Sequence, residues 1–115
     1  MRKPTSTEFL RIFNSTIHWH HLGSKRAKAQ VVMQAADLAA PNPNEGWTRF
    51  VGFTPTQIAK NLIRGWEPAE PVTADRWRHS VRVALAQYFG WDSSDEAIAE
   101  RYETYDIARI EGVQA

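Results

Sequence analysis

One segment, residues 73–89, constrains the fold more than any other because it contains a complete set of helix signals. Its sequence is TADRWRHSVRVALAQYF. At about 100° per residue, five apolar or aromatic residues fall on one narrow arc, as in a helix that packs on a core. These residues are Trp77, Val81, Ala84, Leu85 and Tyr88. Thr73 is suited to cap the first turn, and Gly90 can adopt the left-handed conformation that ends a helix. We therefore expect a core helix over 74–89.

The basic side chains of this segment lie off the predicted core-facing arc. They are Arg76, Arg78, His79 and Arg82. Because charged groups are rarely buried without a partner, we expect all four to be exposed and to face another molecule.

Two further helices are predicted before this segment. Ser6 or Thr7 can cap a helix that extends to about Leu22, where Gly23 stops it. Ser24 can cap a second helix over 25–40. The predicted core face of the first helix contains Phe9, Phe13, Ile17 and His20, and that of the second contains Ala27, Val31, Ala35 and Leu38.

Two more helices complete the prediction. Thr54 followed by Pro55 is the pairing that begins a helix, here over 55–64. Ser93 or Ser94 can cap a last helix that ends near residue 110. Residues 41–46 contain Pro and Gly, residues 66–72 contain two Pro, and both segments are predicted loops. Residues 47–53 are predicted to be one short strand or an extended segment.

The length of 115 residues fits one domain, 1–115, with flexible ends at 1–5 and 112–115. Five helices with at most one strand predict an all-α fold, a compact bundle of about five helices.

Charge is distributed unevenly along the chain. Residues 1–40 have six Lys or Arg and two acids, residues 41–90 have six and four, and residues 91–115 have two and seven. The three sections therefore carry +4, +2 and −5, which favours a basic binding surface with an acidic C-terminal segment. The acidic helix over 93–110 has three open interpretations: a solvated face, a cover over the basic surface of the same chain or of a second copy, or a docking site for a basic partner.

Residues 54–89 resemble a helix-turn-helix DNA-binding domain. The segment TPTQIAKNL would be the positioning helix, and TADRWRHSVRVAL would be the recognition helix in the major groove. The resemblance implies that Arg76, Arg78, His79 and Arg82 meet bases or phosphates, while Gln57 and Lys60 contact the backbone. The connector between the two helices is longer than the usual three or four residues, so their crossing angle is open. An ordinary helical hairpin with a solvated basic face is the alternative.

A second basic patch is predicted at the start of the helix over 25–40. Lys25, Arg26 and Lys28 lie in its first turn, where the helix dipole disfavours positive charge. Cations near aromatic residues are able to bind single strands through phosphates and stacked bases. A solvated surface is again the alternative.

We predict no enzymatic activity and no cofactor. The chain contains no GxSxG, GxxxxGK[ST] or GxGxxG sequence. His18, His20 and His21 cannot converge on one ion from a single regular helix, and the chain has no cysteine, so we expect no metal site.

The composition and these patterns together predict a small cytoplasmic nucleic-acid-binding protein of bacterial or phage origin that has no membrane segment. Duplex DNA is the favoured partner, and single-stranded DNA or RNA is the other possibility. The alternative function is a helical scaffold or adaptor that assembles through the acidic helix 93–110. Small helical subunits of RNA-guided (CRISPR-type) effector complexes are similar to this chain in size, helicity and basic faces, and a phage protein-interaction module belongs to the same alternative.

Overall fold

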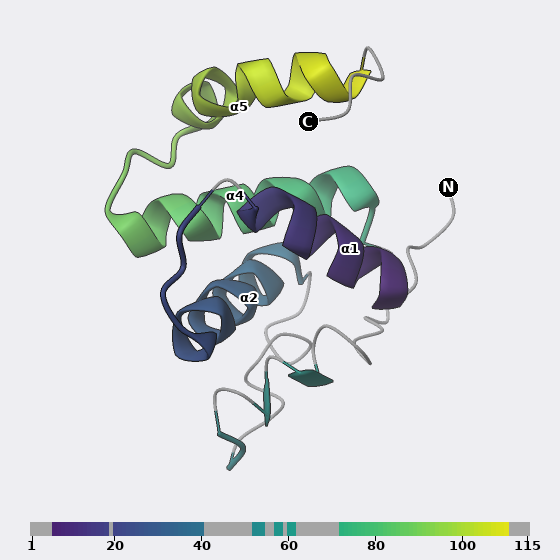
Figure 1. The fold of residues 1–115 in the computed structure, drawn as a ribbon, viewed down its shortest axis with the longest axis vertical. Coiled ribbons are helices and arrows are strands. Elements are labelled where there is room, and N and C mark those ends of the chain that lie inside the picture. Colours follow the sequence, from purple (N-terminus) through teal and green to yellow (C-terminus); the bar gives the residue numbers. More distant parts are fainter. Residues whose placement is uncertain are drawn as a thin grey trace.

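The protein was analysed as a computed structural model, in which residues 6–18, 20–40, 52–54, 57–58, 60–61 and 72–110 are described. Four helices account for most of these residues (Figure 1). They are α1 (Ser6–Ile17), α2 (Lys25–Ala39), α4 (Ala74–Phe89) and α5 (Asp95–Ile110). Within these ranges the chain forms no strand, so the predicted all-α class is confirmed.

Helix α4 is the centre of the molecule. It packs against α1 and α2 on one side and against α5 on another (Figure 1). The Thr73 hydroxyl accepts a hydrogen bond from the Arg76 amide at 3.1 Å, which caps the first turn. Gly90 has φ 75° and ends the helix in the left-handed conformation. The predicted helix over 74–89 is therefore confirmed at both ends.

The main core lies between α1, α2 and α4. Trp77 is its largest buried side chain, and its indole N–H donates to the Phe9 carbonyl at 3.0 Å. The two rings meet edge to face with centroids 5.3 Å apart. Small side chains of α2 allow α4 to approach closely. The core residues include Phe9, Phe13, Ile17, Val31, Val32, Ala35, Ala36, Ala39, Val72, Val81, Ala84 and Leu85.

Helix α1 is shorter than predicted. It ends at Ile17 rather than near Leu22, and the chain then turns so that the His20 amide donates to the Ile17 carbonyl at 2.9 Å. A helix to Leu22 would leave only Gly23 to reverse the chain before α2. The turn instead lets Leu22 pack against the main core.

Helix α2 begins as predicted, because the Ser24 hydroxyl accepts a hydrogen bond from the Ala27 amide at 3.2 Å. Leu38 was expected in the core but is exposed, as is Tyr88 of α4. Each lies near the C-terminal end of its helix, and neither is among the residues packed into the main core.

Helix α5 packs through a second, smaller apolar cluster. Ala86, Ile98 and Tyr102 are buried in it, and Val83 and Trp91 border it. The Ser94 hydroxyl accepts a hydrogen bond from the Ala97 amide at 3.3 Å, which confirms the predicted cap of the last helix.

The region between α2 and α4 is described only in part. The predicted loop 41–46 lies outside the described residues, as do 66–71, most of 47–53 and the ends 1–5 and 112–115. Residues 52–54 form a turn, and the Thr54 carbonyl accepts a hydrogen bond from the Ile58 amide at 2.9 Å. None of the helices described is long and apolar enough to span a membrane.

Candidate nucleic-acid interface

Arg82 does not lie on an exposed face of α4, contrary to the sequence prediction. Only 7% of the residue is accessible to solvent. Its two terminal nitrogens donate to the two carboxylate oxygens of Asp106, at 3.0 and 2.7 Å. Arg82 lies five residues after Trp77, about 140° around the helix, and α5 covers this side of α4. The prediction of an exposed Arg82 is wrong because α4 has a second buried side.

Two tyrosines of α5 surround the same guanidinium group. The Arg82 guanidinium carbon lies 4.5 Å from the ring centre of Tyr102 and 5.6 Å from that of Tyr105. The Tyr105 hydroxyl is within 2.6 Å of the Ser15 hydroxyl, so α5 also contacts α1. Among the residues that the structure describes, the buried Arg82 Nε atom has no hydrogen-bond partner. This arrangement holds Arg82 as part of the α4–α5 contact.

The other basic residues of α4 differ in exposure. Arg76 is exposed. Arg78 is partly buried and donates to Asp75 on the same helix at 2.8 Å. His79 is exposed, and its Nε2 atom lies 3.4 Å from a carboxylate oxygen of Asp95 at the start of α5. Of the four residues expected to contact DNA, two therefore face carboxylates of α5, and one faces a carboxylate of α4.

The basic residues of α2 are accessible, in contrast to Arg82. Lys25, Arg26 and Lys28 are all exposed, and the first turn of α2 contains no acidic residue. The structure therefore brings three cations together at the positive end of a helix dipole, where they add to the attraction for anions.

A capped helical turn carries the remaining predicted contact residues. The Gln57 amide donates to the Thr54 hydroxyl at 3.2 Å, and the Gln57 side-chain oxygen accepts from the Thr54 amide at 3.0 Å. This reciprocal pair is a capping box. Ile58 anchors the turn in the main core, while Gln57, Lys60 and Asn61 are exposed. The predicted start of a helix at Thr54 is confirmed, and its continuation to residue 64 lies outside the described residues.

His20 was predicted to lie on the same helix face as Phe9 and Phe13. It packs instead among Phe89, Trp91 and Tyr102. Its Nε2 atom is 2.8 Å from the Tyr102 hydroxyl, and its ring lies 5.6 Å from that of Trp91. Burial lowers the pKa of His20, and the positive charge of Arg101 lowers it further. Burial also raises the pKa of Tyr102, against the opposing effect of the nearby arginines. His20 therefore joins α5 to the rest of the chain through its ring contacts and its hydrogen bond with Tyr102.

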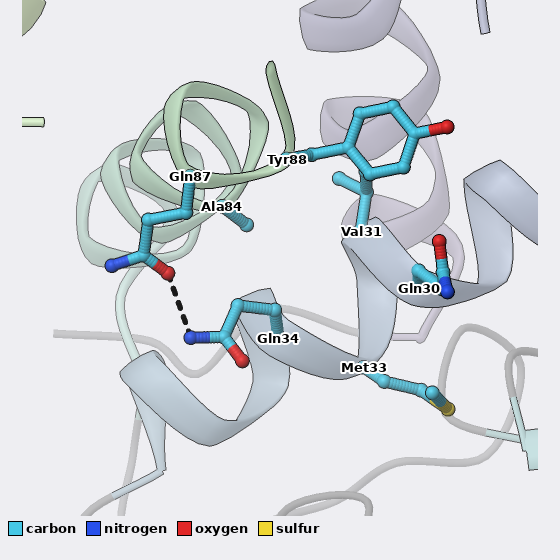
Figure 2. A pocket seen from close by; sticks show the side chains of 7 residues that line it. All are labelled: Gln30, Val31, Met33, Gln34, Ala84, Gln87 and Tyr88. Atoms are coloured by element: carbon cyan, nitrogen blue, oxygen red, sulfur yellow. Dashed lines mark hydrogen bonds between the residues drawn. The ribbon is translucent and has the colours of Figure 1, made fainter. Parts of the chain in front are cut away.

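An open groove of about 440 Å³ runs between α2 and α4 (Figure 2). Val31 and Ala84 contribute its apolar surface, and the Gln34 side-chain nitrogen donates across it to Gln87 at 2.8 Å. The other lining residues are Gln30, Met33 and Tyr88. Amide groups, a thioether and a phenol can contact a polypeptide or a base but supply no nucleophile with an activating base.

Sequence reasoning missed Asp106, Tyr102 and Tyr105, which enclose Arg82. The available signal was the opposite charge of the C-terminal section, and the prediction left open whether that section covers the basic surface of the same chain. The structure shows that α5 does cover part of it.

The chain matches no known protein family, no curated protein and no solved structure at a significant level.

Proposed function

We propose that this chain is a small nucleic-acid-binding protein that catalyses no reaction, most concretely a DNA-binding regulator that contacts DNA through α2 and the capped turn at Thr54. The observation that carries the proposal is the contrast between two groups of cations. Arg82 of α4 is paired within the chain, whereas Lys25, Arg26 and Lys28 of α2 are exposed beside a helix N-terminus. Among the described residues, α2 therefore offers a polyanion a cluster of accessible cations.

The capped turn at Thr54 is the second contact in this proposal. Gln57, Lys60 and Asn61 are three and four residues apart, so they share one exposed side of the turn. Gln and Asn pair well with adenine in the major groove, and Lys pairs with guanine or phosphate. The Asn61 side-chain nitrogen donates to the Gln57 carbonyl at 2.8 Å, which holds part of this surface in place.

The role of α4 changes accordingly. A recognition helix needs a free side that can enter a groove about 12 Å wide. Helix α4 is covered by α1 and α2 on one side and by α5 on another. In the proposal α4 is the scaffold that positions the contact residues, and Arg76 near its N-terminus is an exposed arginine that can contact a phosphate.

The test is fluorescence anisotropy of labelled duplex and single-stranded oligonucleotides at about 50 and 200 mM salt. We expect duplex binding that weakens steeply as salt rises. Replacing Lys25, Arg26 and Lys28 together by Gln should lower the slope of log affinity against log salt by about three. Duplex binding with an unchanged salt slope in this variant would exclude the α2 patch.

A matched control is Arg11→Gln, which removes one exposed cation from α1. Arg11→Gln and Arg26→Gln each lower the net charge by one, but Arg11 lies on α1 and Arg26 lies on α2. We expect Arg26→Gln to weaken binding more than Arg11→Gln does. Equal losses would indicate that only the net charge of the protein matters.

A helical scaffold is the second candidate, and the groove between α2 and α4 favours it. Tyr88 is 44% exposed at the edge of this groove, so its ring is accessible to a second protein surface. If the groove takes part in self-assembly, Tyr88→Ser should lower the mass that light scattering measures at high protein concentration. A wild-type protein that stays monomeric at all concentrations would exclude this candidate.

A further inference from the structure

The contact between α4 and α5 joins groups of opposite charge. Arg82 and Asp106 meet through two parallel N–H···O hydrogen bonds of 3.0 and 2.7 Å. An arginine fork binds two phosphate oxygens in the same two-pronged way. The Asp106 carboxylate therefore occupies the position that a phosphate group would take on Arg82.

A second carboxylate of α5 repeats this relation one turn of α4 earlier. Asp95 lies 3.4 Å from His79, and its side chain is 89% exposed. Arg78, the residue before His79, forms an ion pair with Asp75 of α4 at 2.8 Å. Three side chains that can carry positive charge thus follow one flank of α4, and α5 places carboxylates against two of them.

The apolar part of the α4–α5 contact is small. Ala86, Ile98 and Tyr102 form a buried cluster of their own, separate from the main core that joins α1, α2 and α4. Helix α5 follows the segment 90–94, which begins with the left-handed Gly90. An element that buries few side chains can separate from the rest of the protein at a lower free energy than global unfolding requires.

The geometry points to a second phosphate-binding face on α4, formed by Arg78, His79 and Arg82, in which carboxylates of α5 face His79 and Arg82 in this structure. Its ligand is the sugar-phosphate backbone of a nucleic acid, which competes with Asp95 and Asp106 for the same cations. This inference rests on the proposed function and adds a regulated site to it. The accessible patch on α2 binds first, and the face on α4 becomes available only when α5 moves away.

The experiment compares two variants that each remove two negative charges from α5. Asp95→Asn with Asp106→Asn removes the carboxylates that face α4. Glu100→Gln with Glu103→Gln removes two carboxylates that are exposed on α5. At about 50 mM salt, the first variant should bind an oligonucleotide at least about tenfold more tightly than the second, with a salt slope steeper by about two. Equal affinities and slopes for the two variants would overturn the inference.

A third variant assigns the gain to Arg82. Adding Arg82→Gln to Asp95→Asn with Asp106→Asn should abolish most of the increase in affinity. A gain that persists without Arg82 would show that the increase comes from the change in net charge. Circular dichroism of each variant establishes whether the helices are retained.

A measurement on the wild-type chain covers the case in which the Asp106 variant does not fold. Saturating oligonucleotide should speed the hydrogen exchange of amides in α5 while it slows exchange in α2. Unchanged or slower exchange in α5 at saturation would refute the covered site even if α2 becomes protected.

The failure of this inference is distinguishable from failure of the proposed function. Binding that depends on the α2 cations, together with equal behaviour of the two α5 variants, would overturn the inference alone. Absence of binding by the wild type and by every variant would overturn both.

Discussion

Replacing the two partners of the Arg82–Asp106 ion pair one at a time should give unequal losses of stability. Asp106→Asn leaves a guanidinium that is 7% exposed without an opposite charge. Breaking a buried pair in this way costs about 3–5 kcal/mol. The Asp106 side chain is 31% exposed, so solvent screens part of the interaction. We therefore expect Asp106→Asn to lower the free energy of unfolding by about 2 kcal/mol.

Arg82→Met should be much milder. The long apolar side chain can occupy the space that the arginine stem fills, and it removes the buried Nε donor that has no hydrogen-bond partner. The Asp106 carboxylate left behind can reach water. The expected change is within about 1 kcal/mol of the wild type, in either direction.

The assay is urea unfolding followed by far-ultraviolet circular dichroism, supported by thermal melts. For a chain of this size, a loss of about 2 kcal/mol lowers the melting temperature by roughly 8 °C. Asp95→Asn is the control, because its carboxylate is 89% exposed and should leave stability nearly unchanged. Similar losses for Asp106→Asn and Arg82→Met, or no loss for Asp106→Asn, would refute the buried ion pair as the cause.

Three further predictions concern the core, a helix end and pH. Trp77→Phe should lower the free energy of unfolding by about 2–3 kcal/mol in urea, because it leaves a cavity and removes the hydrogen bond to Phe9; a loss below about 1 kcal/mol would contradict this packing. Gly90→Ala should lower the free energy of unfolding by about 1 kcal/mol, because Gly90 has φ 75°. Gly23 has open space around it and no left-handed backbone, so Gly23→Ala should be neutral or slightly stabilising in the same assay. Burial and Arg101 lower the pKa of His20 in the folded state, so the unfolded chain takes up that proton first as pH falls below about 6.5. Stability should therefore fall as pH drops from 7 through this range, and His20→Gln should reduce that slope in unfolding experiments at several pH values; an identical slope would exclude His20 as the source.

The bounds of helix α4 could be predicted because their determinants are local. Thr73, the apolar stripe from Trp77 onward and Gly90 all lie within one continuous segment, and each acts on the backbone next to it. The same holds for the caps at Ser24, Thr54 and Ser94. Helix α1 was predicted too long, because its end depends on where the chain must turn to bring α2 against α4.

The candidate interface was less predictable because it depends on contacts between distant residues. Helical periodicity places Arg82 off the main apolar stripe, which is correct, but does not reveal that a second helix packs there. The partner of Arg82 lies 24 positions later, at Asp106. The charge pattern could not show whether the acidic helix is solvated, covers the basic surface or docks a partner, because an acidic sequence is compatible with all three roles.

The resulting arrangement separates charge across α4 and gives the molecule a preferred orientation toward a polyanion. Helices α2 and α5 contact α4 from different sides (Figure 1), and α2 presents exposed cations while α5 presents exposed acids. Glu96, Glu100 and Glu103 recur at helical spacing on the exposed side of α5, so they repel a phosphate backbone that approaches from that side. Nucleic acid should therefore meet α2 first, and salt should weaken both the attraction at α2 and the repulsion at α5. In our proposal, Arg82 lies beneath the repelling helix, so it contributes to binding only when α5 moves away.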